Sequence, residues 1–426
     1  MTQSDSSAGT PLAPLSPPPF DPDALALHEA IRRISELVTP VRDTEQVPLE
    51  RADGRILAND LLSTIDVPSH DNAAMDGYSL SADDLSSAGD TVLEVIGSAL
   101  AGRAFQGQPG SGQAVRVMTG AVMPAGHDTV VPQEFVVADR NTVRIPPGQE
   151  AGQNLRRRGE DLRCGESALK AGQRLGPAEC GLIASLGIAE VQVVRRLRVA
   201  ILSTGDELCA PGSPLLEGMI YDSNRSTLRA LLNRMNVDLI DLGIVRDDPA
   251  SLEHAISNAS QQADAIISSA GVSVGEADHT RSIMQRLGQV DFWKIAMRPG
   301  RPLAFGRIGN ALYFGLPGNP VAVMVTFLFM VRDALTHLGG GRVEPVPLIR
   351  ARTLTPIRKR AGRTEYQRAT LSTDSDGSPV VTLMANQGSA VLSSMSRADC
   401  LVVLDHSSAS VPAGGWVNCI PMRLLA

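Results

Sequence analysis

The segment from Arg198 to Leu338 alternates short apolar runs with amphipathic stretches, and this alternation constrains the fold more than any other feature. RVAILS, VDLIDLGIV and ADAIISS are aliphatic runs typical of strands that are buried on both faces. The intervening SNRSTLRALLNRM and PASLEHAISNASQQ have helical spacing, with Ser223 as the expected cap of the first and Pro249 near the start of the second. Strands that alternate with helices predict a mostly parallel sheet covered on both faces.

The rest of the chain predicts further domains around this α/β segment. Residues 23–62 have helical spacing, and residues 152–190 return to a partly helical pattern that could rejoin the same unit. Between them, residues 63–151 contain strand-like pieces separated by Gly, Pro and Asp turns, which predicts a β-rich domain. With the α/β domain assigned to 191–340, the short strands of 341–426 predict a compact β-barrel or sandwich.

Several classes of protein are disfavoured by composition. Residues 1–22 are rich in Ser and Pro without a basic or apolar region, so we expect a disordered leader and not a secretory signal. The longest apolar run, Val321 to Val331, is shorter than the roughly 20 residues needed to cross a bilayer, so no membrane partner is expected. A net charge of −7 argues against broad nucleic-acid binding.

The five cysteines are odd in number and lie far apart in the sequence. No CxxC or Cys/His spacing that is typical of zinc sites is present, and no disulfide framework is predicted. We therefore expect single buried thiols and a reducing, cytoplasmic environment.

Three predicted strands of the α/β domain run into polar, glycine-rich loops. The loop residues expected to bind a ligand are Gly205, Asp206, Gly271, Ser273, Gly275, Pro317 and Gly318. Glycines let backbone N–H groups approach an anion, and the helix that follows each loop adds a favourable dipole. Each loop taken alone is more typical of an ordinary turn, but the three together predict a phosphate-binding rim.

Carboxylates gather at the same predicted strand ends. They are Asp206, Glu207, Asp222, Asp247, Asp248, Glu276 and Asp278. Such a cluster repels itself unless a cation lies among its members, and Mg²⁺ held by carboxylates and substrate phosphates is the usual solution. For any single member, helix capping or simple solvation is the alternative.

The stretch KIAMRPGRP supplies three cations, Lys294, Arg298 and Arg301, that should face this rim. They could hold phosphate or another oxyanion, and a solvated turn is the alternative. A second basic run, Arg156 to Arg158, is equally compatible with a solvated or salt-bridged surface. No arrangement typical of nucleophilic catalysis stands out, so the residues by themselves predict a metal-assisted enzyme acting on a phosphorylated ligand.

Nine motifs resemble one protein family over nearly the whole chain. They are DVPSHDNAAMDGY (66–78), VRVMTGAVMPAGHDTVV (115–131), NLRRRGEDL (154–162), AILSTGDEL (200–208), GMIYDSN (218–224), GVSVGEAD (271–278), RPGRPLAFG (298–306), GLPGNPVA (315–322) and GRTEYQR (362–368). In these motifs the sequence resembles the molybdopterin molybdenumtransferases, of the bacterial MoeA type and the E domain of gephyrin.

The resemblance implies a fold and an activity. The implied fold is multidomain α/β plus β, with a molybdopterin-binding α/β sandwich, a β-rich domain, a split elongated domain (23–62 and 152–190) and a C-terminal β-barrel. The implied reaction inserts molybdate into adenylylated molybdopterin with Mg²⁺-assisted release of AMP. It also implies a homodimer with the site between subunits, and a molybdopterin adenylyltransferase as the upstream partner.

The resemblance also implies site residues. Those outside the α/β domain are Asp71, Asp76, Thr119 and Asp161, with Arg363 as a further contributor from the barrel. Those within it are Glu207, Asp247, Asp278, Lys294 and Arg298. Our hypothesis gives the cation to Glu207, Asp247 and Asp278, and the negative charge of phosphate or molybdate to Lys294 and Arg298.

Two departures from the common pattern concern geometry. Arginines stand at positions 298 and 301, where lysines are frequent, which keeps the charge and changes its shape. Ala270 stands where a glycine often precedes GVSVG, which matters only if that residue needs a positive φ.

Three alternative functions are compatible with part of this resemblance. A molybdopterin adenylyltransferase or a competence-damage-type protein would use a related α/β domain without the other segments. A non-enzymatic scaffold is the third alternative.

Overall fold

The computed structural model describes residues 23–270 and 277–425. The chain forms two units, one built from residues 44–194 and the other from residues 195–426 together with the segment that ends at Asp43. Each unit has its own sheets and its own core.

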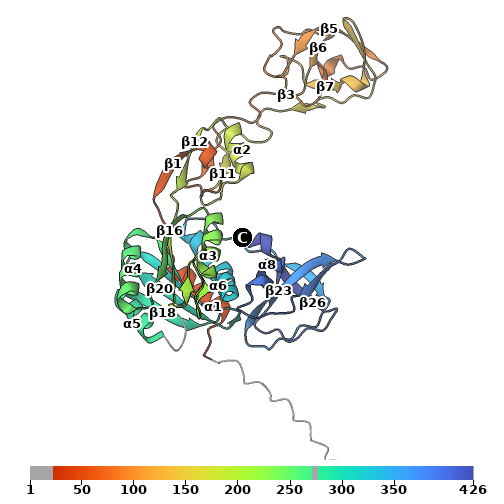
Figure 1. Cartoon of the computed structure of the whole chain (residues 1–426). Coiled ribbons are helices and arrows are strands. Elements are labelled where there is room, and N and C mark those ends of the chain that lie inside the picture. The colour runs from red at the N-terminus through yellow and green to blue at the C-terminus, as the bar shows by residue number, and fades with distance from the viewer. Residues whose placement is uncertain (1–22, 271–276, 426) are drawn as a thin grey trace, which may run out of the picture. The chain divides into compact units, whose positions relative to one another are not determined.

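The larger unit contains the predicted α/β domain (Figure 1). Its six-stranded sheet has the order β16-β13-β17-β21-β20-β18. The strands in that order are β16 (Asp238–Val245), β13 (Arg198–Thr204), β17 (Ala265–Ser269), β21 (Ala311–Leu316), β20 (Pro302–Ile308) and β18 (Gly288–Lys294). The first four are parallel and β20 runs antiparallel to its neighbours, so the prediction of a mostly parallel sheet is confirmed.

Helices cover both faces of this sheet, as predicted. Alternate residues of β13 enter different cores: Val199 and Ile201 contact the cluster that includes α3, whereas Ala200 and Leu202 contact the cluster that includes α4 and α5. The helices are α3 (Ser223–Arg234), α4 (Pro249–Gln262), α5 (Ala277–Leu287), α6 (Pro320–Thr326) and α7 (Arg332–Leu338). A strand buried on both faces explains why the apolar runs show no alternation.

One predicted helix cap was wrong. Ser223 is the first residue of α3, and the N-cap is Asp222, whose side chain accepts a hydrogen bond from the backbone N–H of Arg225 at 3.0 Å. Both residue types are good caps, so the sequence did not separate them.

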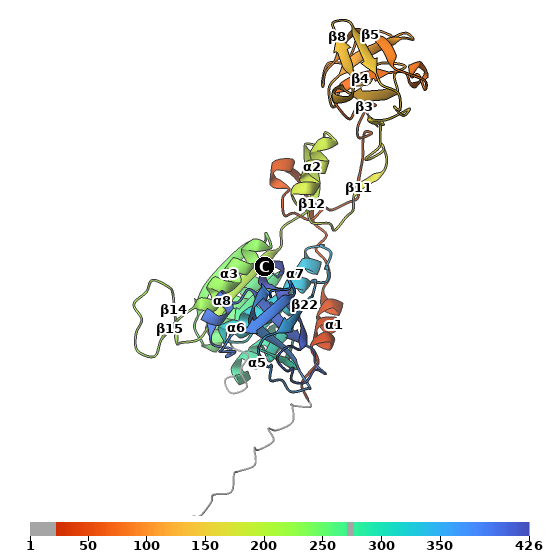
Figure 2. The ribbon, with the colours of Figure 1, turned by 90° about the vertical axis from the view of Figure 1, so that its right-hand side faces the viewer.

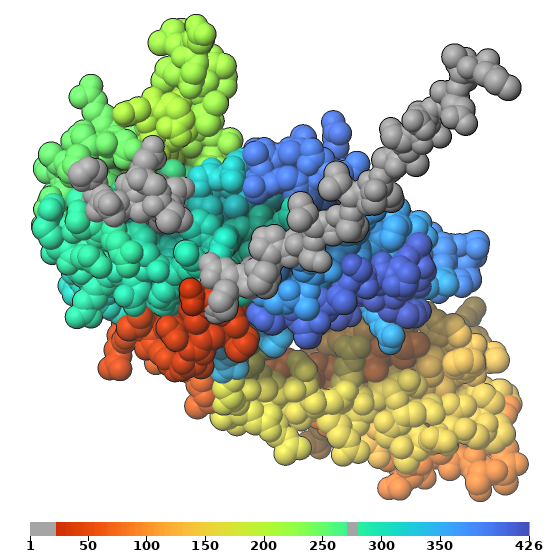
Figure 3. All heavy atoms as spheres, turned by 90° about the horizontal axis from the view of Figure 1, so that it is seen from below, coloured from red at the N-terminus to blue at the C-terminus, as the bar shows by residue number. Residues whose placement is uncertain are grey.

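The N-terminal helix α1 (Leu27–Leu37) packs in the larger unit and not with the residues of the split domain in which we predicted it. Leu27, Ala30 and Ile34 are buried in the α/β core, and Figure 3 shows the red atoms of α1 against the green-to-cyan atoms of that domain. The helical spacing showed that one face of α1 is buried, but such a stripe does not identify the core that covers it.

The helical segment 320–338 is continuous, with a π-helical turn (Phe327–Val331, η4) between α6 and α7. Among the described residues it is the one helix that is long and apolar enough to cross a membrane. Of its most apolar window, 67% is buried inside the structure, where it packs in the α/β core. This burial is typical of a core helix of a folded domain.

The C-terminal strands close into a five-stranded barrel. Its order is β23-β24-β22-β26-β25, and β25 pairs back with β23. The strands are β23 (Thr364–Thr373), β24 (Pro379–Leu383), β22 (Ile349–Thr353), β26 (Trp416–Pro421) and β25 (Cys400–Leu404). The short strand β19 (Met297–Arg298) leaves the α/β domain and pairs with β23, so the KIAMRPGRP stretch lies against the barrel.

Two further segments of the larger unit contribute to its surface. A short helix, α8 (Leu392–Arg397), packs against α6 and β23. Figure 2 shows residues 208–221 as a loop projecting from the α/β domain, with β14 (Leu208–Cys209) and β15 (Ile220–Tyr221) at its base.

The smaller unit is made of β-structure and one helix. Its pairs β1–β12 and β2–β11, together with α2 (Pro177–Ser185), join segments from both ends of the unit around one core. These strands are β1 (Thr44–Pro48), β12 (Glu190–Val194), β2 (Leu61–Leu62) and β11 (Ser167–Leu169). The segment predicted to be β-rich, residues 63–151, forms a separate six-stranded sheet in this unit. Its strand order is β7-β4-β6-β5-β9-β8. These strands are β7 (Thr129–Pro132), β4 (Gly77–Leu80), β6 (Gln113–Val117), β5 (Thr91–Ala99), β9 (Thr142–Ile145) and β8 (Val137–Asp139).

All five cysteines lie in described residues and are free thiols. Cys209, Cys400 and Cys419 are buried, as predicted, whereas Cys164 is exposed, contrary to the prediction, and Cys180 is partly buried.

Candidate functional site

The carboxyl ends of β13 and β16 bring two predicted carboxylates to one place. These strands are parallel neighbours, with Thr204 opposite Val245, so the residues that follow them share one edge of the sheet. The Thr204 hydroxyl donates to Oδ1 of Asp247 at 3.3 Å, and Glu207 lies one turn beyond Thr204. Both carboxylates are exposed, so they are accessible to a ligand.

Gly205 is needed between Thr204 and Glu207. Its φ is +146°, and a Cβ added there would lie 2.6 Å from Oε2 of Glu207. A side chain at this position would displace the carboxylate, so the glycine permits the close approach of the Glu207 side chain to the loop backbone. The predicted Asp206 is exposed beside it.

Two other carboxylates of the predicted cluster have structural roles. Asp222 is 1% exposed, caps α3 and forms an ion pair with Arg225 at 3.1 Å. Asp248 caps α4, and hydrogen bonds from the backbone and side chain of Ser251 lower the pKa of its carboxyl. These two residues follow the capping alternative.

The described residues contain no group of three or more His, Cys, Asp or Glu side chains placed to hold a metal ion. Of the predicted ligands, Glu207 and Asp247 are present at one edge. Asp278 lies in α5, but its side chain is outside the described residues, as are Gly271, Ser273, Gly275 and Glu276. Two carboxylates fit Mg²⁺ only when substrate phosphates and water complete the coordination, which is how Mg²⁺ is commonly bound.

Asn224 connects the ends of β17 and β21, and sequence reasoning missed it. From the first turn of α3, its side-chain amide donates to Ser269 Oγ at 2.9 Å and to the Gly318 carbonyl at 2.7 Å. Its own Oδ1 is buried without a hydrogen-bond partner. Asn224 therefore holds together the starts of two predicted rim loops, those after Ser269 and at Pro317–Gly318. The signal available was its place in the GMIYDSN motif.

Ala270 adopts the left-handed conformation that the sequence left in question. Its φ is +72°, and its backbone N–H donates to the Leu316 carbonyl at 3.2 Å. The position therefore requires a positive φ, which is unfavourable for alanine.

The predicted cations lie where the sheet meets the barrel. Lys294 ends β18, whose carboxyl end is at the same edge as those of the parallel strands. Arg298, in β19, is paired in register with Glu365 of β23, and Arg301 directly precedes β20. Gly300 between the two arginines has a φ of +97°, and a Cβ there would lie 2.3 Å from Thr326 Oγ1, so this turn fits closely against α6.

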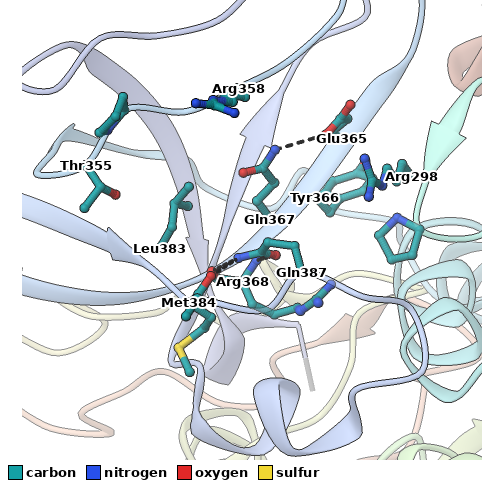
Figure 4. Close-up of a pocket in the computed structure, with 13 residues that line it drawn as sticks. Arg298, Thr355, Arg358, Glu365, Tyr366, Gln367, Arg368, Leu383, Met384 and Gln387 are labelled. Carbon is teal, nitrogen blue, oxygen red and sulfur yellow. Dashed lines mark hydrogen bonds between the residues drawn. The ribbon is translucent and has the colours of Figure 1, made fainter. Parts of the chain in front are cut away.

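Arg298 lines a cavity of about 560 Å³ between the barrel and the turn that follows β19 (Figure 4). The lining residues are Arg298, Pro299, Thr355, Pro356, Arg358, Glu365, Tyr366, Gln367, Arg368, Leu383, Met384, Ala385 and Gln387. Its single lining carboxylate, Glu365, already binds Arg363 at 2.7 Å and accepts from Gln367 at 3.0 Å. Three arginines thus line a cavity whose one carboxylate is already engaged, and this excess of positive charge is typical of an anion site.

Arg368 is the buried member of this set and was not predicted. It is 1% exposed and donates to Ser394 Oγ at 3.0 Å and to the carbonyls of Asn386 and Gly388, but to no carboxylate of the described chain. Burial, and then the like charge of Arg298, lower the pKa of Arg368 to about 10. A buried cation with neutral partners favours a bound anion.

Arg363, which we expected to contact substrate, forms its ion pair with Glu365 in this structure. The positive charge of Arg363 is therefore neutralised by a carboxylate of the barrel. Arg358 and Arg368 line the cavity in its place.

In the smaller unit, the predicted residues gather around the strand β3 (Asn72–Ala73), which pairs with β10 (Leu155–Arg156). Asp76 Oδ1 accepts from both the backbone N–H and the hydroxyl of Thr119, each at 2.7 Å, and these bonds lower the pKa of Asp76. Asp71 Oδ1 accepts from the backbone N–H of Arg158 at 2.7 Å.

The other predicted residues of this unit are held nearby. The backbone N–H of Asp161 donates to the Val67 carbonyl at 3.0 Å, and its side chain is exposed. In the basic run that precedes it, Arg158 binds Asp66 at 2.6 Å, which is the salt-bridged alternative.

Comparison with known proteins identifies the family. Residues 25–187 match the MoeA N-terminal region (domains I and II), residues 200–337 match a probable molybdopterin-binding domain, and residues 350–422 match the MoeA C-terminal region (domain IV). A molybdopterin molybdenumtransferase of Haemophilus influenzae is 41% identical over 403 residues, which cover 94% of this chain and 99% of that protein. The chain belongs to the molybdopterin molybdenumtransferase family.

Other members agree with this assignment. A molybdopterin molybdenumtransferase of a Nostoc species is 41% identical over 342 residues, with 78% of this chain and 77% of that protein covered. The crystal structure of the molybdopterin biosynthesis MoeA protein of Pyrococcus horikoshii OT3 has a TM-score of 0.80 and 26% identity, and covers 93% of this chain and 99% of that one. Because the match includes the regions outside the α/β domain, an adenylyltransferase or a scaffold is not favoured as the function of this family member.

Proposed function

We propose that this chain transfers molybdenum from molybdate to molybdopterin, using adenylylated molybdopterin and releasing AMP. The observation that carries the proposal is the cavity lined by Arg298 and Arg368, which adjoins the carboxyl edge of a sheet with glycine-containing loops. An oxyanion in the cavity and a phosphorylated ligand on the loops would be neighbours. The names of the relatives support this pair of substrates.

Within this proposal, Arg298 and Arg368 hold molybdate. Arg368 supplies a preorganised buried charge, and Arg298, on a strand paired with the barrel, supplies a second guanidinium from the α/β side. Two planar forks suit a tetrahedral oxyanion because each can donate two hydrogen bonds. Lys294 and Arg301 add positive charge at the end of the sheet where the phosphates of the substrate would bind.

Glu207 and Asp247 are the residues that would hold Mg²⁺, together with the phosphates of the substrate. Mg²⁺ there would neutralise phosphate charge and favour departure of AMP. The Thr204 hydroxyl orients Asp247, and the absence of a side chain at Gly205 leaves room for the Glu207 carboxylate beside the loop backbone.

We further propose a homodimer in which Asp71, Asp76, Thr119 and Asp161 of one copy complete the site of the other. Their support is the residue-by-residue resemblance and the ordered placement of Asp76 by two bonds from Thr119. A molybdopterin adenylyltransferase would supply the adenylylated substrate. Five free thiols agree with a cytoplasmic enzyme.

The test is to incubate the full chain with adenylylated molybdopterin and Mg²⁺ and to measure AMP release with and without molybdate. Release that depends on molybdate is the expected result. The variant Arg298→Ala should need about tenfold to hundredfold more molybdate for half-maximal release, since a charged hydrogen bond contributes about 1.5–3 kcal/mol.

The matched control is Arg350→Ala. Arg350 is an exposed barrel arginine, and it lies 4.9 Å from the Trp416 ring centroid and outside the cavity lining. Its replacement should leave the molybdate requirement unchanged. Tight binding of the adenylate without any AMP release would refute the transfer reaction and favour the scaffold alternative.

A further inference from the structure

The cavity between the barrel and the turn that follows β19 is larger than one oxyanion requires. An anion with four oxygens needs space on the order of 100 Å³, since each water-sized atom takes about 30 Å³. The cavity measures about 560 Å³, within the range of about 300–1,000 Å³ that is typical of sites for small organic ligands. Space for a second group therefore remains once Arg298 and Arg368 have bound an oxyanion.

The remaining space has its own polar groups. In Figure 4, Thr355 and Arg358 lie on the opposite side of the cavity from Arg298. The hydroxyl of Thr355 is buried and has no hydrogen-bond partner. No ion pair joins Arg358 to a carboxylate of the described chain. An unused buried donor and a guanidinium without an ion pair, both lining one cavity, are a combination that an anion satisfies.

The backbone around Thr355 is held in place before any ligand binds. Its carbonyl accepts from the Thr353 hydroxyl at 2.7 Å, and the flanking Leu354 and Ile357 donate backbone bonds to Val381 and Val411 at 2.9 and 2.8 Å. Such anchoring fixes the backbone that carries Thr355, so little ordering of the backbone is needed on binding.

Apolar side chains lie beside these polar groups. Leu383 and Met384, at the end of β24, line the same side of the cavity as Thr355 and offer aliphatic and thioether surface. Methionine adapts to flat or irregular partners and contacts rings favourably. A bare inorganic anion would leave this surface exposed to water, whereas an organic anion would cover it.

We propose that Thr355, Arg358, Leu383 and Met384 form a second anion subsite, which binds the phosphate of an organic phosphate monoester and packs its ring or carbon skeleton on Leu383 and Met384. The inference rests on the proposed function in one respect, because cleavage of adenylylated molybdopterin leaves two products of this chemical class, AMP and the molybdopterin that carries molybdenum. A separate metabolite of the same class is the other source.

The experiment titrates phenyl phosphate, and separately molybdate, into the full chain by calorimetry. Phenyl phosphate should bind the unmodified protein, and the Arg358→Ala substitution should weaken this binding by at least about tenfold. Thr355→Val, which keeps the shape and removes the hydroxyl, should weaken it by about fivefold. Both variants should leave molybdate affinity within about twofold of its original value, since Arg298 and Arg368 are retained.

Arg350→Ala serves again as the control and should bind both ligands normally. The proposal is overturned if phenyl phosphate does not bind the unmodified protein, or if Arg358→Ala and Thr355→Val bind it with unchanged affinity. It is also overturned if Arg298→Ala by itself abolishes the binding of both phenyl phosphate and molybdate. Weaker inhibition by AMP in Arg358→Ala would identify AMP as the occupant. Unchanged inhibition by AMP, together with lost binding of phenyl phosphate, would identify a different phosphate monoester as the occupant. Absence of molybdate-dependent AMP release, with the phenyl phosphate results as expected, would refute the proposed function alone.

Discussion

The side-chain amide of Asn224 donates a hydrogen bond to the backbone carbonyl of Gly318 at 2.7 Å, and so ties the start of α3 to the loop after β21. The same amide donates to Ser269 at the end of β17. One side chain thus sets the spacing of two loops that we propose to bind the substrate.

Replacing Asn224 with Asp should lower turnover by about tenfold or more, because the carboxylate cannot donate and would face the Gly318 carbonyl. Steady-state AMP release at several pH values measures this effect. Part of the activity should return as pH falls, since a protonated aspartate donates one bond. Asn233→Asp, an exposed change on the same helix, should have no effect. Equal losses in both variants would show that the effect comes from helix charge and not from the loop contacts.

Glu207→Gln and Asp247→Asn should each raise the Mg²⁺ concentration for half-maximal activity by about tenfold or more, because a neutral amide is a weaker ligand for a hard cation. A titration of activity with Mg²⁺ measures the change. Asp248→Ala is the contrasting variant, since Asp248 caps α4. It should lower the free energy of unfolding by about 1 kcal/mol and leave the Mg²⁺ requirement unchanged. A higher Mg²⁺ requirement in Asp248→Ala would contradict our assignment of roles.

Ala270→Gly should raise the free energy of unfolding by up to about 1 kcal/mol. The left-handed φ of +72° costs alanine about 1–2 kcal/mol, and the greater freedom of glycine in the unfolded chain offsets part of the gain. Urea unfolding measures the difference. Ala250→Gly, in the first turn of α4, should change stability in the opposite direction. A loss of stability in Ala270→Gly would mean that packing of the Ala270 methyl group stabilises the fold by more than its positive φ destabilises it.

Thr119→Val should raise the pKa of Asp76 part of the way to its ordinary value, because one of its two hydrogen bonds is removed and the backbone bond remains. Because the pKa of Asp76 is lowered in the folded protein, its hydrogen bonds stabilise the fold at pH values above the ordinary pKa of an aspartate. This stabilisation is lost as the pH falls through the lowered pKa. On acidification, the free energy of unfolding of the variant should therefore fall at a higher pH than that of the unmodified protein. NMR titration of the Asp76 carboxyl measures the shift, with the exposed Thr142→Val as control. An unchanged Asp76 pKa would show that the hydroxyl bond is not formed in solution.

Much of the fold was predictable from local pattern. The strands and helices from Arg198 to Leu338 were expected within a few residues of where they occur, because burial on both faces leaves long aliphatic runs and helices carry their own capping signals. The position of α1 was not predictable in this way. Its apolar stripe is the same whichever core covers it.

The candidate site was predictable in part. Gly205, Glu207 and Asp247 were expected at strand ends, and parallel strands bring their carboxyl ends to one edge whatever the details of packing. Arg368 was not expected as a site residue, although it is the last residue of the GRTEYQR motif, because the type of a charged residue inside a strand does not show that it is buried beside a cavity. Its role depends on burial and on the approach of Arg298 from another domain.

The sequence by itself determined the order of elements, the parallel sheet with its polar edge, and the family to which the chain belongs, since these depend on residues a few positions apart or on ordered motifs. The tertiary structure alone decided which cations face a common cavity, that Arg363 is engaged by Glu365, and that Asn224 joins two loops. The physical reason is that periodicity and capping act within a few residues of the chain, whereas charge, burial and hydrogen bonding at a site depend on side chains that only folding brings together.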